Sequence, residues 1–104
     1  MKYEEFIKKE LNALSSEHSI EYVAIVEKII SRVDFEEITD DDYIQDEIIQ
    51  NLNDVIIYSD DMWTIARDYC FNPRELDMDD AYIELIEICE EIVFKAWGLY
   101  QEEA

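Results

Sequence analysis

The stretch YIELIEICEEIVFKAWGLY, residues 82–100, decides the fold of this chain. Its apolar side chains recur every three or four residues over about five turns, the spacing that places residues on one face of an α-helix. That face comprises Tyr82, Leu85, Ile86, Cys89, Ile92, Val93, Ala96, Trp97 and Tyr100. We expect the helix to begin after the acidic residues at 77–80, because carboxylates stabilise a helix amino terminus. Gly98 falls inside the pattern and weakens the prediction near the end of the helix.

Apolar spacing of the same kind predicts further helices in the rest of the chain. Two of them lie near residues 3–14 and 19–33. A third begins at a capping box formed by Thr39 and Asp42 and runs to about residue 53. A fourth begins at Ser59 and ends before Pro73. The segment DVIIYS, residues 54–59, fits a short strand or an irregular turn, because β-branched residues dominate it. One glycine and one proline are too few for the turns of a multi-stranded β domain. We therefore predict an all-α fold, a small single-domain bundle of about four to five helices over residues 1–104.

Negative charge is concentrated in the last two thirds of the chain. Residues 1–33 hold six acidic and five basic side chains, whereas residues 34–104 hold 22 acidic and three basic ones. The segment DFEEITDDDYIQDE, residues 34–47, has eight carboxylates and no lysine or arginine. The net charge of -20 opposes compaction, but an apolar content of 49% predicts that the chain folds.

The composition argues against catalysis. One histidine, His18, cannot form a histidine pair for zinc, and one glycine cannot form a phosphate-cradling loop. The aspartate runs near 40 and 77 lack the glycine that an EF-hand requires. Cys70 and Cys89 are too few and too far apart for a disulfide framework or a CxxC site, so we expect them in the core. We predict no enzymatic activity, no cofactor and no metal.

Charge and hydropathy also limit the partners. No apolar run approaches the roughly 18 to 20 residues of a membrane span. The first residues lack the apolar centre of a signal peptide, so we expect a cytoplasmic protein. A strongly acidic chain is repelled by nucleic acid and by anionic lipid. The expected partner is therefore a basic protein, with no direct contact to nucleic acid or membrane.

Many of the carboxylates fall in rows along the predicted helices. They recur every seven residues on two helices and at spacings of four, three and four on the last, with no lysine or arginine in any row. Neighbours about 5 to 6 Å apart on a helix resemble the phosphates of a nucleic-acid strand. We expect these acids to substitute for phosphates in a cationic DNA-binding groove, although a solvated acidic face explains any single row equally well. The candidate residues are Asp40, Asp41, Asp42, Asp46, Glu47 and Asp54, then Asp60, Asp61 and Asp68, and on the last helix Asp80, Glu84, Glu87 and Glu91.

The stretch ITDDDYIQDEIIQNLNDVIIYSDDMWTIARDY, residues 38–69, resembles the central segment of the Ocr-type phage antirestriction proteins. The matching positions are Val55, Tyr58, Asp61, Met62 and Trp63. Ile56 replaces the family's proline, and the similarity covers about a third of the chain with a one-residue gap. The resemblance implies a helical, acidic homodimer that imitates bent B-form DNA and blocks restriction enzymes. Several phage inhibitors of CRISPR nucleases are also small and acidic.

Two other functions fit the sequence. An immunity or antitoxin protein would neutralise a basic toxin through acids gathered around an aromatic hot spot such as Tyr58, Trp63 or Tyr69. An adaptor or assembly subunit would associate through a second apolar edge of the last helix. That edge comprises Ile88, Phe94 and Leu99.

Overall fold

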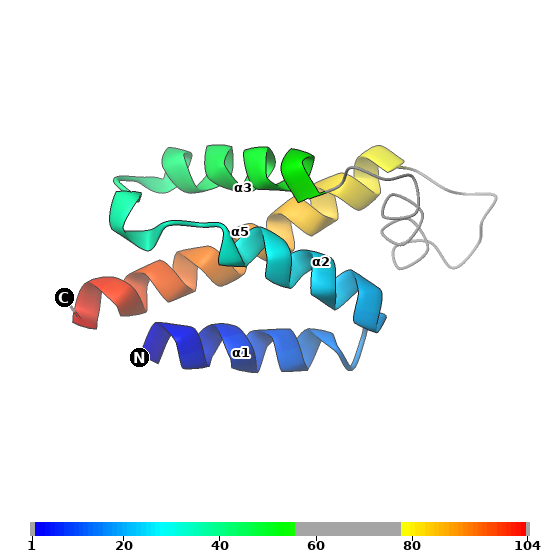
Figure 1. Ribbon diagram of the computed structural model, residues 1–104, viewed down its shortest axis with the longest axis horizontal. Helices are drawn as coiled ribbons and strands as arrows, with labels where there is room; N and C mark the ends of the chain where they lie inside the picture. The colour runs from blue at the N-terminus through cyan, green and yellow to red at the C-terminus, as the bar shows by residue number, and fades with distance from the viewer. Residues whose placement is uncertain (1, 56–77, 104) are drawn as a thin grey trace.

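The computed structural model describes residues 2–55 and 78–103, and all of its regular elements within these ranges are helical. The elements are α1 (Lys2–Leu14), α2 (Ile20–Ser31), the short 3-10 helix η1 (Phe35–Glu37), α3 (Asp41–Val55) and α5 (Met78–Glu103), drawn in Figure 1. The all-α prediction is confirmed for these ranges. Some of the predictions lie outside the described residues. They are the helix that begins at Ser59, the carboxyl-terminal part of DVIIYS, and the candidate residues Asp60, Asp61 and Asp68.

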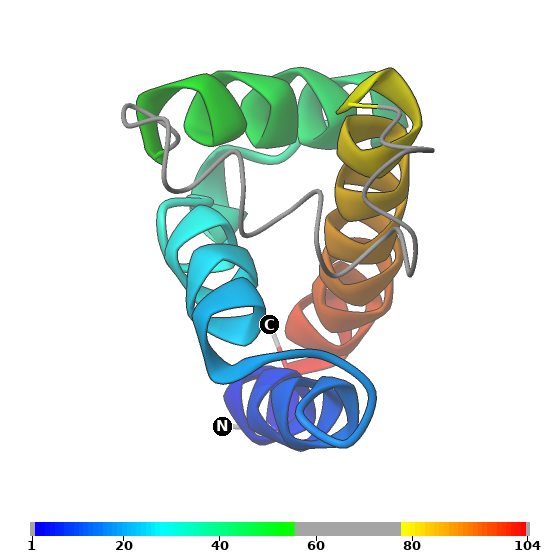
Figure 2. The ribbon, with the colours of Figure 1, turned by 90° about the vertical axis from the view of Figure 1, so that its right-hand side faces the viewer.

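Helix α5 is the centre of the packing. It contacts α1, α2 and α3, and α2 also packs on α1 and α3. Figure 2 shows α3 and α1 on opposite sides of the molecule, with α2 and α5 between them. The start of α1 meets the end of α5, where the backbone N–H of Lys2 donates a hydrogen bond to the carboxylate of Glu103. The contact between α3 and α5 places the two most acidic helices side by side.

The core consists of the apolar faces of α2, α3 and α5. Its fully buried members include Val26 and Ile29 from α2, Ile44 and Ile48 from α3, and Leu85, Cys89 and Val93 from α5. By contrast, α1 has no buried residue. Its apolar side chains, Phe6, Ile7, Leu11 and Leu14, are partly buried and pack against this core. Helix α1 is therefore a peripheral element laid on a three-helix core.

Side chains cap the amino termini of α2 and α3. The hydroxyl of Ser19 accepts a hydrogen bond from the backbone N–H of Tyr22, 3.2 Å away, at the start of α2. At α3 the carboxylate of Asp40 accepts from the N–H of Tyr43 at 2.8 Å. We predicted Thr39 as this cap, so the helix begins one residue later than expected. A carboxylate accepts this bond more strongly than a hydroxyl because it is charged.

Two residues inside the helices behave differently from their usual preference. Gly98 made the prediction of a helix uncertain near that residue, but α5 continues through it to Glu103. Its φ angle is not positive, so this glycine has ordinary helical geometry. Asn51 of α3 is the one buried polar residue of the described core, and its Nδ2 donates to the carbonyl oxygen of Ile29 at 3.2 Å. That carbonyl lies in the last turn of α2, so Asn51 joins α3 to the carboxyl end of α2.

Candidate functional site

The acidic and basic residues are distributed unequally among the helices. Helix α3 has five acidic residues and no basic one, and α5 has eight acidic residues and one lysine. Helix α1 instead has three acidic and three basic residues, and α2 has two and one. Because α3 and α1 lie on opposite sides (Figure 2), the side of the described helices that carries α3 is strongly acidic, whereas α1 itself is balanced, although α5 brings acidic residues beside it. The charge imbalance predicted from the sequence is therefore an imbalance between surfaces.

Helix α3 presents most of its carboxylates to solvent. The side chains of Asp41, Asp42, Asp46 and Asp54, and of the cap Asp40, are exposed, and Glu47 is half-buried. The opposite face holds Ile44, Ile48, Asn51 and Leu52 against the core. No basic residue of the described ranges forms an ion pair with any of these acids. Five of the six candidate residues of this segment are therefore exposed on or next to α3.

The pKa of Tyr43 is raised by burial and by the negative charge near the start of α3. Burial raises the pKa of its phenol, and the carboxylates of Glu47, Glu37 and Asp34 raise it further. Asp34 and Glu37 belong to the segment around η1, so the fold adds them to the α3 surface. Our candidate residues began at Asp40 and omitted these two acids. The signal was present in the sequence, because both lie in the acidic stretch 34–47.

The row of acids expected on α5 differs from the prediction. Glu87 and Glu91 are exposed and Glu84 is half-buried, while the side chain of Asp80 lies outside the described residues. Nζ of Lys95 lies 3.1 Å from Oε1 of Glu91, one helical turn away. The expectation that no basic residue relieves this row was therefore wrong at Glu91. Lysine four residues after glutamate is the favourable orientation for such a pair.

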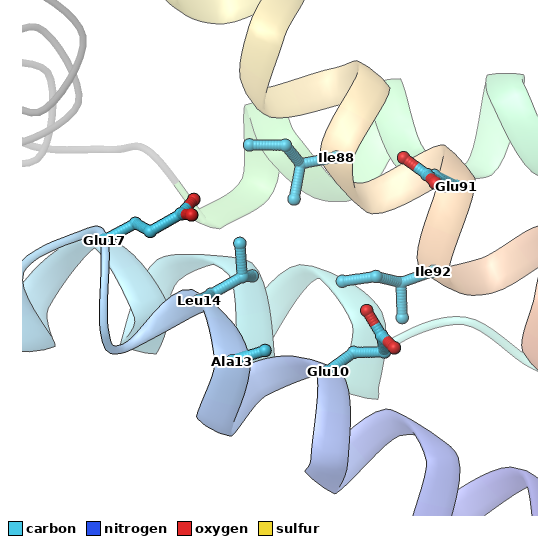
Figure 3. A pocket seen from close by; sticks show the side chains of 7 residues that line it. All are labelled: Glu10, Ala13, Leu14, Glu17, Ile88, Glu91 and Ile92. Atoms are coloured by element: carbon cyan, nitrogen blue, oxygen red, sulfur yellow. The ribbon is translucent and has the colours of Figure 1, made fainter.

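Glu91 also lines a hollow between α5 and α1. The hollow has a volume of about 230 Å³, and Ala13, Leu14, Ile88 and Ile92 form its apolar part. Three carboxylates surround it, those of Glu10, Glu17 and Glu91 (Figure 3). Ile88, which we had placed on a free apolar edge for self-association, thus faces α1. Phe94 of the same edge packs against the core.

A different acid of α5 is held in an unfavourable environment. Oε1 of Glu90 is buried and has no hydrogen-bond partner among the described residues. Burial raises the pKa of this carboxyl group, and the charge of Glu87 raises it further. Its ionised form is therefore less stable in the folded protein than in the unfolded chain. This penalty is present above the folded-state pKa and absent below the unfolded one.

Replacing Glu90 by glutamine is expected to stabilise the protein at neutral pH by about 0.5 kcal/mol. The effect is small because the side chain is only partly buried and water screens its charge. The amide keeps the shape and removes the charge. The gain should disappear below about pH 4, where the glutamate of the parent protein is itself protonated. Urea unfolding at several pH values measures this difference. As a control, Glu87→Gln removes an exposed charge and should stabilise less; equal gains would show that repulsion, not burial, destabilises Glu90.

The remaining candidates for chemistry take structural positions. The ring of His18 stacks on that of Tyr22, with centroids 4.4 Å apart. Cys89 is fully buried in the core, as predicted, and burial raises the pKa of its thiol to about 12, so it stays a neutral thiol. No three histidine, cysteine or acidic side chains of the described residues are placed to bind a metal ion. Cys70 and the aromatic residues Tyr58, Trp63 and Tyr69 lie outside the described ranges.

None of the described helices combines the length and the apolar character needed to cross a membrane.

No family model, curated protein or solved structure matches this chain.

Proposed function

We propose that the protein inhibits a DNA-binding defence nuclease of a bacterial host, a restriction enzyme or a CRISPR effector, by occupying its cationic DNA groove. The acids of α3 and α5 would substitute for phosphates. Proteins of this kind are encoded by phages, and the resemblance to Ocr-type proteins implies the same mode of action and a homodimer. The proposed inhibitor needs no cofactor and performs no chemistry.

The charge density of the α3 segment carries this proposal. Residues 40–54 include six carboxylates. At a rise of about 1.5 Å per residue this segment is about 21 Å long. Six charges over that length leave five intervals that average roughly 4.2 Å along the axis, somewhat wider than the 3.4 Å per phosphate of a DNA strand. No lysine or arginine interrupts it.

The second support is the separation of the charges. An acidic protein that only needs solubility can distribute its carboxylates over every face and pair them with lysine. Here α3 has no basic residue, and the balanced helix α1 lies on the opposite side. A groove lined with lysine and arginine would bind the acidic side and release counterions as it does on binding DNA.

The test is displacement of DNA. A fluorescent duplex bound to a restriction enzyme or a CRISPR effector is titrated with the protein, and anisotropy is followed at about 50 to 300 mM NaCl. We expect displacement that weakens steeply with salt, because each carboxylate that contacts the groove releases counterions. Enzymes of both classes that keep their DNA at the lowest salt would contradict the proposal.

Matched variants locate the surface. The triple variant Asp42→Asn, Asp46→Asn, Asp54→Asn removes three exposed charges from α3 and is expected to weaken inhibition about tenfold and to flatten its salt dependence. The control Glu4→Gln, Glu5→Gln, Glu21→Gln removes three exposed charges from α1 and α2. It should change inhibition less than about twofold. Equal losses from the two triples would mean that total charge matters and that the acidic side has no special role.

A further inference from the structure

The hollow between α1 and α5 combines an apolar floor with a charged rim. Leu14 from α1 and Ile88 and Ile92 from α5 point into the space between the helices (Figure 3). The carboxylates of Glu10 and Glu17 extend into the same space from the α1 side. At about 230 Å³ the hollow is smaller than the roughly 300 to 1,000 Å³ of small-molecule sites. It has room for a single long side chain.

The position of Glu17 is set by the backbone. The N–H of Glu17 donates to the carbonyl oxygen of Leu14 at 3.0 Å, and the N–H of His18 donates to the same oxygen at 2.9 Å. These bonds close the turn after α1 and hold Glu17 at one end of the hollow. Glu10 lies seven residues earlier, inside α1, and its carboxylate extends toward the same space (Figure 3). The two carboxylates thus bracket Leu14.

The basic residues of α1 do not neutralise this rim. Lys8 lines a separate groove between α1 and α2, and neither Glu10 nor Glu17 has an ion-pair partner among the described residues. Glu91 is the exception, since it is bonded to Lys95 on its own helix. That pair is exposed, so it is weak and open to competition by another cation.

The acidic rim and the apolar floor favour an organic cation as the occupant. The three carboxylates are not placed to bind one metal ion. The charge of the rim excludes an anion, and a purely apolar side chain would leave these acids facing it without compensation. A guanidinium group has five donors in a planar fork and can bond several carboxylates at once, whereas its methylene stem packs on apolar surface.

We infer that this hollow binds an arginine side chain of a protein partner, with the stem against Leu14, Ile88 and Ile92 and the guanidinium at the rim, where the carboxylates of Glu10, Glu17 and Glu91 supply the negative charge. The site lies on the side of α5 that faces α1, away from the α3 acids. It would add recognition of one side chain to the less specific attraction of the acidic surface. It does not depend on whether the protein displaces DNA.

The probe is N-acetyl-arginine amide, added to the full chain with methyl-labelled isoleucine and leucine. We expect shifts in the NMR signals of Leu14, Ile88 and Ile92 and a dissociation constant of about 1 to 10 mM. The citrulline analogue, which has the same shape without the charge, should leave these signals unchanged. A matched response to citrulline, or an equal one to N-acetyl-lysine amide, would overturn the assignment to arginine.

Three variants test the rim. Glu17→Gln is expected to weaken arginine binding about threefold, as is Glu10→Gln. Lys95→Gln should strengthen it about twofold, because Glu91 loses its competitor. The control Glu5→Gln changes the same charge at an exposed position of α1 outside the hollow and should have no effect. If Glu5→Gln weakens binding as much as Glu17→Gln, the shifts reflect general attraction to an acidic protein and the site does not exist.

Discussion

Replacing Leu85 by alanine is expected to lower the free energy of unfolding by about 2 to 5 kcal/mol. Leu85 is 0% exposed and belongs to the core cluster on α5, the helix that contacts α1, α2 and α3. Its removal leaves a cavity where three helices meet. Domains of this size have a total stability of about 5 to 15 kcal/mol. The net charge of -20 reduces that stability further when salt is low.

Urea unfolding followed by circular dichroism measures the loss. At low salt the Leu85→Ala variant should unfold at a clearly lower urea concentration than the parent protein, and added salt should raise the midpoint of both. The control is Ile83→Ala, two residues earlier on the same helix, where the side chain is 53% exposed. We expect a change of less than about 0.5 kcal/mol there. Similar losses at the two positions would mean that α5 does not bury the face assigned to it.

Replacing Asn51 by aspartate is expected to cost about 3 kcal/mol or more at neutral pH. Asn51 is 6% exposed, and its Nδ2 donates to the carbonyl oxygen of Ile29. Aspartate has the same shape but presents an acceptor oxygen to that carbonyl and adds a buried negative charge. The folded-state pKa of the new carboxyl group would lie above its unfolded value. The destabilisation should therefore be complete above that pKa and shrink as the pH falls to about 4, where the protonated group can donate again.

Two variants separate the causes of this effect. Asn51→Leu removes the hydrogen bond without adding charge, and the N–H of Arg32 still donates to the Ile29 carbonyl oxygen at 3.3 Å. We expect a loss of only about 1 kcal/mol. Asn53→Asp makes the same chemical change at an exposed position of α3 and should alter stability by less than about 0.5 kcal/mol. A small, pH-independent effect of Asn51→Asp would show that Asn51 does not bond to α2.

The helices themselves could be predicted from local patterns. The spacing of Leu85, Cys89 and Val93 indicated the buried face of α5, and all three are 0% exposed. The prediction failed at helix starts. The last helix was expected to begin after residues 77–80, but α5 begins at Met78 and includes Asp79 and Asp80. At α3 two local signals competed. Thr39 and Asp40 both precede α3, and only the geometry of the turn selects the one that caps it. Gly98 was given too much weight, because flanking apolar residues hold α5 in a helix.

The candidate site could be predicted only in part. The acids of α3 lie close together along the chain on one helix, which its periodicity already indicated. The pair of Glu91 and Lys95 is predictable from the sequence, because the two residues are four positions apart on one helix. Asp34 and Glu37 join the surface near Tyr43 only because the chain turns back after α2.

The sequence by itself determined the helical class, the apolar faces and the excess of negative charge, because hydrogen bonds within a helix join residues only four apart. The tertiary structure decided which helices meet. It placed the neutral α1 opposite the acidic α3, brought Asn51 to Ile29 across 22 positions of sequence, and set Glu10 and Glu17 against α5. These relations depend on how side chains of different helices fill space together, and no single helix contains that information.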